Sequence, residues 1–156
     1  HWPHLLQIHL NKRLNSWMTK LLFVITEDWY FYTHRFSLAK ALHDRGYEVI
    51  VATRISNYRK AIEDAGIRVI PLRKMNRSSL NPFREWALFW ELLSIYRVER
   101  PDIVHHVALK PVIYGSIAAR LAGIQAIVNA LGGLGFIFSS QKKLASILRP
   151  VLILLF

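Results

Sequence analysis

Five short apolar segments, separated by stretches with helical spacing, constrain the fold of this chain most strongly. The first, Leu21–Ile25, is an unbroken apolar run, which is typical of a central parallel strand buried on both faces. Alternation of such strands with helices, joined by short turns, predicts a doubly wound parallel α/β sheet. We expect its strands near residues 21–25, 48–52, 69–72, 103–106 and 126–130.

Helix start and stop signals support this order of elements. Asn81 is a good N-cap, and Pro82 suits the first helical position because its missing N–H is not needed there. Glycines stand where left-handed C-terminal caps are wanted. We expect helices over about 34–45, 58–65, 82–99 and 111–121.

Composition narrows the classes of function. The chain has 156 residues, enough for one core, and its apolar fraction of 53% excludes disorder. It has no cysteine, which excludes disulfides and thiolate chemistry. A net charge of +11 indicates anionic partners. We interpret residues 1–17 as an upstream extension and residues 18–156 as the domain; a membrane-surface helix is the alternative for the extension.

Several common site motifs are missing. The first strand is followed by TEDWYFYTHR instead of the GxGxxG of dinucleotide-binding folds, and neither GxxxxGK[ST] nor GxSxG occurs. His105 and His106 are adjacent on a strand and therefore point to opposite faces. Since no carboxylate or cysteine follows them, we expect no metal site.

The candidate binding residues lie where strands end, because ligands of open α/β sheets bind at the carboxyl ends of strands. Two groups meet this condition: acidic, aromatic and basic residues after the first strand, and residues after the fourth and fifth strands. They are Glu27, Asp28, Tyr32, His34, Arg35, His106, Lys110, Asn129, Gly132, Gly133 and Gly135.

Three stretches together resemble the amino-terminal domain of family 4 glycosyltransferases. They are LLFVITEDWYFYTHRFSLAKALHDRGYEVIVATR, SLNPF and RPDIVHHVALKPVIYGSIAARLAGIQAIVNALGGLGFIF. The nearest resemblance is to bacterial enzymes that add sugars to lipid-linked or polysaccharide acceptors, and it covers about residues 20–156. It implies the N-terminal half of a GT-B architecture, in which two Rossmann-like domains face each other across a cleft.

The resemblance also implies chemistry. The first domain binds the acceptor and the second binds the nucleotide-sugar, which is a co-substrate; no metal or other cofactor is required, and transfer typically retains the anomeric configuration. A second domain is absent from the chain, so we expect it to be inactive alone. Relatives often carry a histidine after the fifth strand. Here Asn129 and the glycine backbone amides are the nearest substitutes, and the catalytic residue stays unassigned.

The basic stretch before the long helix indicates a membrane surface. Arg73, Lys74, Arg77 and Arg84 adjoin Trp86, and anionic lipids attract such clusters. We expect a cytoplasmic protein, peripheral at the inner face of the membrane. Burial of this helix against the missing domain or against a neighbouring core helix is the alternative.

Two other classes of function stay open. A non-catalytic binding domain, or a split subunit that needs a donor-binding partner, is the main alternative to the transferase. A basic nucleic-acid binder is the third reading: the charge permits it, but no recognised motif supports it and the aromatic residues adjoin carboxylates, so we expect no nucleic-acid partner.

Overall fold

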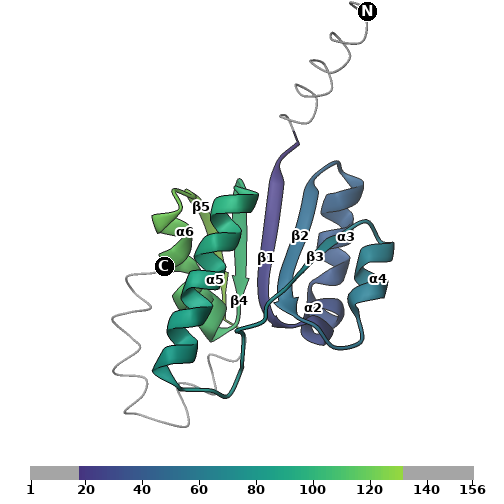
Figure 1. Ribbon diagram of the computed structural model, residues 1–156. Coiled ribbons are helices and arrows are strands. Elements are labelled where there is room, and N and C mark those ends of the chain that lie inside the picture. The colour runs from purple at the N-terminus through teal and green to yellow at the C-terminus, as the bar shows by residue number, and fades with distance from the viewer. Residues whose placement is uncertain (1–17, 132–156) are drawn as a thin grey trace, which may run out of the picture.

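The computed structural model describes residues 18–131, which form a five-stranded parallel sheet with helices on both faces (Figure 1). Every strand pair is parallel, and the strand order is β3-β2-β1-β4-β5. The predicted doubly wound sheet is therefore confirmed, with strand ends within two residues of the predicted ones. The strands are β1 Lys20–Glu27, β2 Glu48–Arg54, β3 Arg68–Pro71, β4 Ile103–Val107 and β5 Ala126–Ala130.

Strand β1 is central because its apolar run is buried on both faces. Leu22, Phe23, Val24 and Ile25 are fully buried. The strand order reverses on the two sides of β1, since β2 follows it on one side and β4 on the other. The carboxyl ends of β1 and β4 thus form the switch point where ligands of such sheets usually bind.

The helices divide between the two faces. Alternate residues of β1 belong to separate core clusters: Leu22 and Val24 to one, Leu21 and Phe23 to the other. The first face carries α5 (Pro82–Glu99), η1 (Pro111–Gly115) and α6 (Ser116–Leu121); the second carries α2 (Asp28–His34), α3 (Phe36–Asp44) and α4 (Arg59–Asp64).

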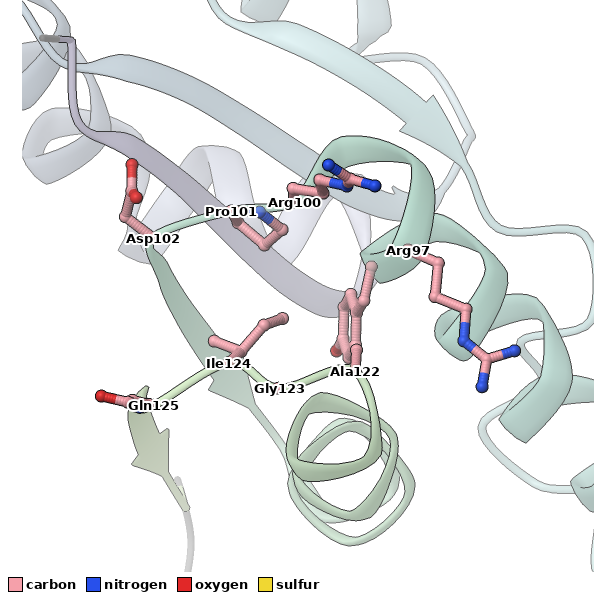
Figure 2. Close-up of a pocket in the computed structure, with 9 residues that line it drawn as sticks. Arg97, Arg100, Pro101, Asp102, Ala122, Gly123, Ile124 and Gln125 are labelled. Atoms are coloured by element: carbon pink, nitrogen blue, oxygen red, sulfur yellow. The ribbon is translucent and has the colours of Figure 1, made fainter. Parts of the chain in front are cut away.

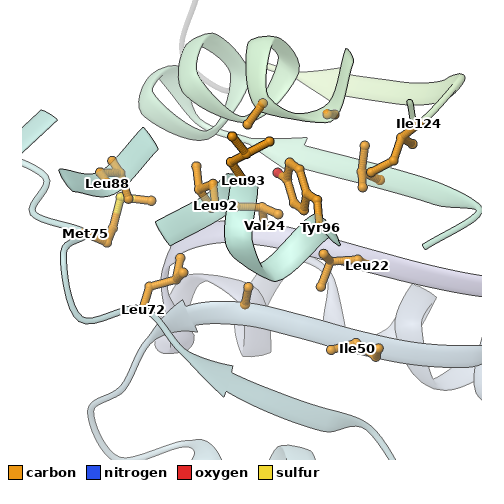
Figure 3. Packing of buried hydrophobic residues seen from close by; sticks show 14 residues of the cluster. Leu22, Val24, Ile50, Leu72, Met75, Leu88, Leu92, Leu93, Tyr96 and Ile124 are labelled. Atoms are coloured by element: carbon orange, nitrogen blue, oxygen red, sulfur yellow. The ribbon is translucent and has the colours of Figure 1, made fainter. Parts of the chain in front are cut away.

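Helix α5 supplies much of the first core. Its Leu88, Leu92, Leu93 and Tyr96 pack on β1 and β4 (Figure 3). The predicted start is confirmed: Asn81 Oδ1 accepts a hydrogen bond from the Phe83 amide at 3.0 Å, and Pro82 takes the first position. The helix ends at Glu99, as expected.

The sequence did not predict two local features. The aromatic stretch after β1 forms helix α2, and the predicted helix over 34–45 follows it, from Phe36 to Asp44. The reason is that Phe31 packs edge-on against Phe23, with ring centroids 5.5 Å apart, and draws this segment onto the sheet. The predicted helix over 111–121 starts as one π-helical turn, η1.

Residues 1–17 and the glycines after β5 lie outside the described residues, so the domain boundaries stay predictions. None of the helices within residues 18–131 is long and apolar enough to span a bilayer.

Candidate functional site at the carboxyl ends of the strands

The parallel sheet brings the predicted site residues to one edge. Glu27 and Asp28 stand at the end of β1, His106 near the end of β4, and Asn129 near the end of β5. Registers link these strands directly, since Ile25 pairs with Val107 and Val107 with Ala130. Gly132, Gly133 and Gly135 lie outside the described residues.

Asp28 is fully buried and holds a loop in place. Its Oδ2 accepts hydrogen bonds from the amides of Ser56 and Tyr58 at 2.8 and 3.1 Å, and its Oδ1 accepts one from the Ser56 hydroxyl. The prediction placed Asp28 in an open cleft. We correct it, because the first turn of α2 turns this carboxylate inward onto the loop that follows β2.

His106 is also buried, in a network of neutral groups. Its Nε2 lies 2.8 Å from the Tyr96 hydroxyl and its Nδ1 lies 2.8 Å from Asn129 Oδ1, which also accepts from the Ser116 hydroxyl at 3.1 Å. An amide oxygen only accepts, so Nδ1 carries the proton and Nε2 accepts from Tyr96. The network ties α5 and β4 to the end of β5. Both ring nitrogens of His106 are therefore occupied within the fold, and one of them supports Asn129, so any part of His106 in binding stays a prediction.

Burial fixes the protonation of this network. It lowers the pKa of His106 to about 4, despite the hydrogen bond to Asn129, and raises the pKa of Tyr96 well above its usual value. Gly115 is needed here, because a Cβ at that position would lie 2.5 Å from the His106 ring and 3.0 Å from the Tyr96 hydroxyl. The π-helical turn brings this glycine against the ring, a geometry that the sequence pattern did not reveal.

Lys110 holds three segments of the fold together through hydrogen bonds. Its Nζ donates to the carbonyls of Asn76 and Ser79, at 2.6 and 2.5 Å, and to Glu85 Oε1 at 2.6 Å. These bonds join the loop after β3, the first turns of α5 and the chain after β4. The predicted role of Lys110 as an anion-binding residue is corrected, since all three ammonium donors are used within the fold.

The remaining predicted residues are more open. Glu27 lies 3.8 Å from Arg54, Tyr32 packs against Phe36 and Tyr58, and His34 is exposed. Among the described residues, two buried nitrogens have no hydrogen-bond partner: Arg35 Nε and His105 Nε2. Burial, and secondarily the charge of Arg35, lower the pKa of His105.

A basic hollow of about 430 Å³ lies at the start of α5. It gathers three of the residues predicted for a membrane surface, Arg73, Lys74 and Arg84, and adds Arg54 from the end of β2. Sequence reasoning missed Arg54, although its place after a strand was a usable signal. It also missed Glu91, whose carboxylate accepts from the amides of Arg73 and Lys74 at 2.8 and 2.9 Å. Arg77 does not line this hollow.

An apolar groove of about 560 Å³ lies beside the basic hollow, between α5 and the η1–α6 segment. Trp86 belongs to this groove. Its other members were not predicted, because they come together from two helices. The lining consists of Leu80, Pro82, Glu85, Trp86, Phe89, Tyr114 and Ile117.

A further hollow, of about 680 Å³, lies at the opposite edge of the sheet (Figure 2). It is formed by the end of α5 and the turn after α6, with Arg97, Arg100, Asp102 and Gln125 among its residues. This is the amino edge of the strands, away from the switch point, so we do not assign the site to it.

No cluster of three or more histidine, aspartate or glutamate side chains suited to a metal ion occurs within residues 18–131. The arrangement at the carboxyl edge offers instead cations, backbone amides and apolar surface. These groups suit an anionic substrate with an apolar part.

The parallel sheet and its layers of helices define a Rossmann-like α/β domain. Residues 20–156 match the model of the family described as "Glycosyl transferase 4-like", and the chain belongs to this family. A curated relative from Campylobacter jejuni, an N,N'-diacetylbacillosaminyl-diphospho-undecaprenol alpha-1,3-N-acetylgalactosaminyltransferase, is 31% identical over 121 residues. The match covers 78% of this chain and 32% of the relative, so the chain spans about a third of that enzyme.

Solved glycosyltransferases share the fold. MurG from Acinetobacter baumannii aligns with a TM-score of 0.55 at 17% identity, over 71% of this chain and 35% of MurG. A glycosyltransferase from Rickettsia africae aligns with a TM-score of 0.56 at 21% identity, over 73% of this chain and 29% of that one. The predicted family and the Rossmann-like fold are thereby confirmed.

Proposed function

We propose that this chain is the acceptor-binding half of a glycosyltransferase that moves a sugar from a nucleotide-sugar to a lipid-linked acceptor. The family match over residues 20–156 carries this proposal. The relative from C. jejuni, whose name describes a diphospho-undecaprenol acceptor, supports the kind of acceptor. The basic hollow beside an apolar groove agrees with an anionic lipid substrate.

The donor is expected to bind to a second domain. Glu27, Tyr32, His34, Arg35, Asn129 and the glycine loop after β5 would then face it across a cleft. Transfer would retain the anomeric configuration and use neither a metal nor another cofactor. Holding both substrates in reacting geometry supplies much of the rate of such a reaction, so the chain alone is expected to be inactive.

A chimera tests this function. Residues 20–156 would replace the matching stretch of the C. jejuni enzyme, and transfer of radiolabelled sugar to a diphospho-undecaprenol acceptor would be measured. We expect transfer by the chimera and none by the isolated chain. A folded chimera that binds the nucleotide-sugar but transfers nothing would favour a non-catalytic binding domain. Turnover by the isolated chain would contradict the two-domain requirement.

We also place the domain at the cytoplasmic face of the membrane, where it would be peripheral. Leu80 and Phe83 are 88% and 85% exposed; Phe83 lines the basic hollow with Arg73, Lys74 and Arg84, and Leu80 lines the apolar groove. Each basic residue near an anionic surface contributes about 1 kcal/mol at most, within a Debye length of about 8 Å. Insertion of the apolar side chains would add a part that salt does not weaken.

Vesicle co-sedimentation tests the membrane role. Replacing Arg73, Lys74, Arg77 and Arg84 by glutamine should remove the salt-sensitive part of binding to anionic vesicles. Trp86→Ala should reduce the part that persists in high salt. If the four-residue variant sediments as the parent does, the basic loop is only a solvated surface.

A further inference from the structure

The apolar groove and the basic hollow lie along the same helix, α5. Helix α5 separates them, and its side chains divide by helical spacing. Pro82, Glu85, Trp86 and Phe89 line the groove, whereas Phe83, Arg84 and Ala87 line the hollow. The two cavities therefore flank the first two turns of one helix, one on each side.

Lys110 links the linings of the two cavities. Its Nζ is bonded to the carbonyl of Asn76, which lines the hollow, and to the carboxylate of Glu85, which lines the groove. The Lys110 and Glu85 side chains are 13% and 14% exposed, so this link is largely buried and is not a chance surface contact.

The groove is close to neutral and largely apolar. The charge of Glu85 is matched by Lys110 at 2.6 Å. Tyr114, opposite, is un-ionised, because partial burial and a hydrogen bond to Glu85 raise its pKa to about 12. The remaining lining is hydrocarbon or aromatic. Such a slot favours an apolar chain and disfavours a charged group.

The basic hollow, in contrast, carries a high positive charge. It holds Arg54, Arg73, Lys74 and Arg84 and no carboxylate among its lining residues. Arg54 lies 3.8 Å from Glu27. Within residues 18–131, no carboxylate lies within ion-pair distance of the side chains of Arg73, Lys74 or Arg84. Guanidinium groups bind phosphate oxygens through paired hydrogen bonds, and unpaired cations in a concave site attract a multiply charged anion.

We propose that the groove and the hollow together bind an isoprenyl diphosphate, with its hydrocarbon chain in the groove and its diphosphate in the hollow. The inference rests on the proposed lipid-linked acceptor, and it assigns the part of the protein that holds the lipid. The diphosphate at the start of α5 would lie on the carboxyl side of the sheet, where the sugar of the acceptor reaches the switch point. The exposed Leu80 and Phe83 form the rim over which the chain enters from the membrane.

Binding of farnesyl diphosphate to the isolated chain tests the inference, since this probe has both parts and is soluble in water. Titration calorimetry would compare it with inorganic diphosphate and with farnesol. We expect farnesyl diphosphate to bind at least tenfold more tightly than either part alone, which corresponds to about 1.4 kcal/mol.

Variants separate the two halves. Trp86→Ala and Ile117→Gln, in the groove, should weaken farnesyl diphosphate at least fivefold and leave inorganic diphosphate unchanged. Arg84→Gln should weaken both diphosphates and leave farnesol unchanged. Matched controls are Leu121→Gln on α6 and Arg97→Gln on α5; both residues are exposed and line neither cavity. These controls should stay within twofold of the parent.

Equal affinity for farnesyl diphosphate and inorganic diphosphate would overturn the inference, as would unchanged binding in the groove variants. If Trp86→Ala and Arg84→Gln reduce vesicle binding but not farnesyl diphosphate binding, the surface contacts only the bilayer and the inference also fails. Failure of the lipid-site inference can be distinguished from failure of the proposed transferase function. A chimera that transfers sugar with unchanged KM when it carries Trp86→Ala would refute the lipid site alone.

Discussion

Two charged side chains at the carboxyl edge hold neighbouring loops in opposite ways. Asp28, on the β2 side of the switch point, accepts three hydrogen bonds, all from the neutral amides and hydroxyl of Ser56 and Tyr58. Lys110, on the β4 side, donates three, of which one reaches the carboxylate of Glu85. The carboxylate of Asp28 is thus stabilised by hydrogen bonds from neutral groups alone. The ammonium group of Lys110 is stabilised by neutral carbonyls and also by the opposite charge of Glu85.

Asp28 and Lys110 differ in burial as well as in the sign of their charge. Asp28 has no exposed surface, whereas Lys110 and Glu85 keep a narrow contact with water. If Asp28 is removed, a fully buried acceptor of three hydrogen bonds is lost, although water can reach its donors in part, because Ser56 is exposed and Tyr58 is half-buried. If Lys110 is removed, water can likewise reach Glu85 in part. Since Asp28 is the more deeply buried of the two charges, we infer that it stabilises the fold more than the Lys110–Glu85 pair does.

The largest expected effect comes from Asp28→Ala. The variant loses the buried acceptor of two amides and a hydroxyl, which water replaces only in part, and we expect the free energy of unfolding to fall by about 3 kcal/mol. Urea unfolding followed by circular dichroism measures this. Asp28→Asn retains one acceptor oxygen and should lose about half as much. A loss below about 1 kcal/mol for Asp28→Ala would break the comparison.

The buried neutral imidazole of His106 should make the stability of the fold depend on pH. Because the pKa of His106 is about 4 in the folded chain and 6.5 ordinarily, the unfolded state takes up a proton first as pH falls. The stabilisation from neutral His106 is complete above pH 6.5 and is lost between pH 6.5 and about 4. It amounts to about 3 kcal/mol.

His106→Gln is the matching variant, since glutamine keeps a donor and an acceptor but does not titrate. Unfolding free energies at pH 7 and pH 4.5 would be measured for both proteins. The parent should lose more stability than the variant over this interval. Identical pH profiles would show that His106 does not carry the dependence.

The sheet was predictable because its signals are local. Apolar runs such as Leu21–Ile25, and the pairing of Asn81 with Pro82, mark their elements without knowledge of distant residues. Helix α2 was missed because four consecutive aromatic residues fit a cleft lining as well as a packed helix. Only the contact of Phe31 with Phe23 decides between these arrangements.

The site was predictable only in its location. Strand ends identified Asp28, His106 and Lys110, but the inward direction of these side chains depends on partners far along the chain. Ser56 lies 28 residues from Asp28, and Glu85 lies 25 residues from Lys110. The basic hollow was found in part, since Arg73, Lys74 and Arg84 are close in sequence. Arg54 joins them from another strand.

The next effect in size concerns the buried pair. Lys110→Met leaves Glu85 and two carbonyls without their donor, and we expect a loss of about 2 kcal/mol. Adding Glu85→Gln should recover part of it, because the uncompensated carboxylate is then removed. Urea unfolding of the two single variants and the double variant gives the coupling energy. Strict additivity would mean that the two side chains act independently.

The smallest expected effect is at an exposed pair of similar geometry. Lys40 Nζ lies 2.9 Å from Asp44 Oδ2 on helix α3, but these side chains are 51% and 56% exposed. Water screens the attraction, and the order of lysine before aspartate opposes the helix dipole, so the coupling energy should be about 0.3 kcal/mol. The double-variant cycle Lys40→Met with Asp44→Asn measures it.

Salt supplies the control for this pair. At 1 M salt the Debye length is about 3 Å, and the coupling of Lys40 with Asp44 should fall towards zero. The coupling of Lys110 with Glu85 should change little, since these groups are shielded from solvent. Equal couplings in the two pairs, or equal sensitivity to salt, would show that burial is not what distinguishes the charges inside the carboxyl edge from those on the surface.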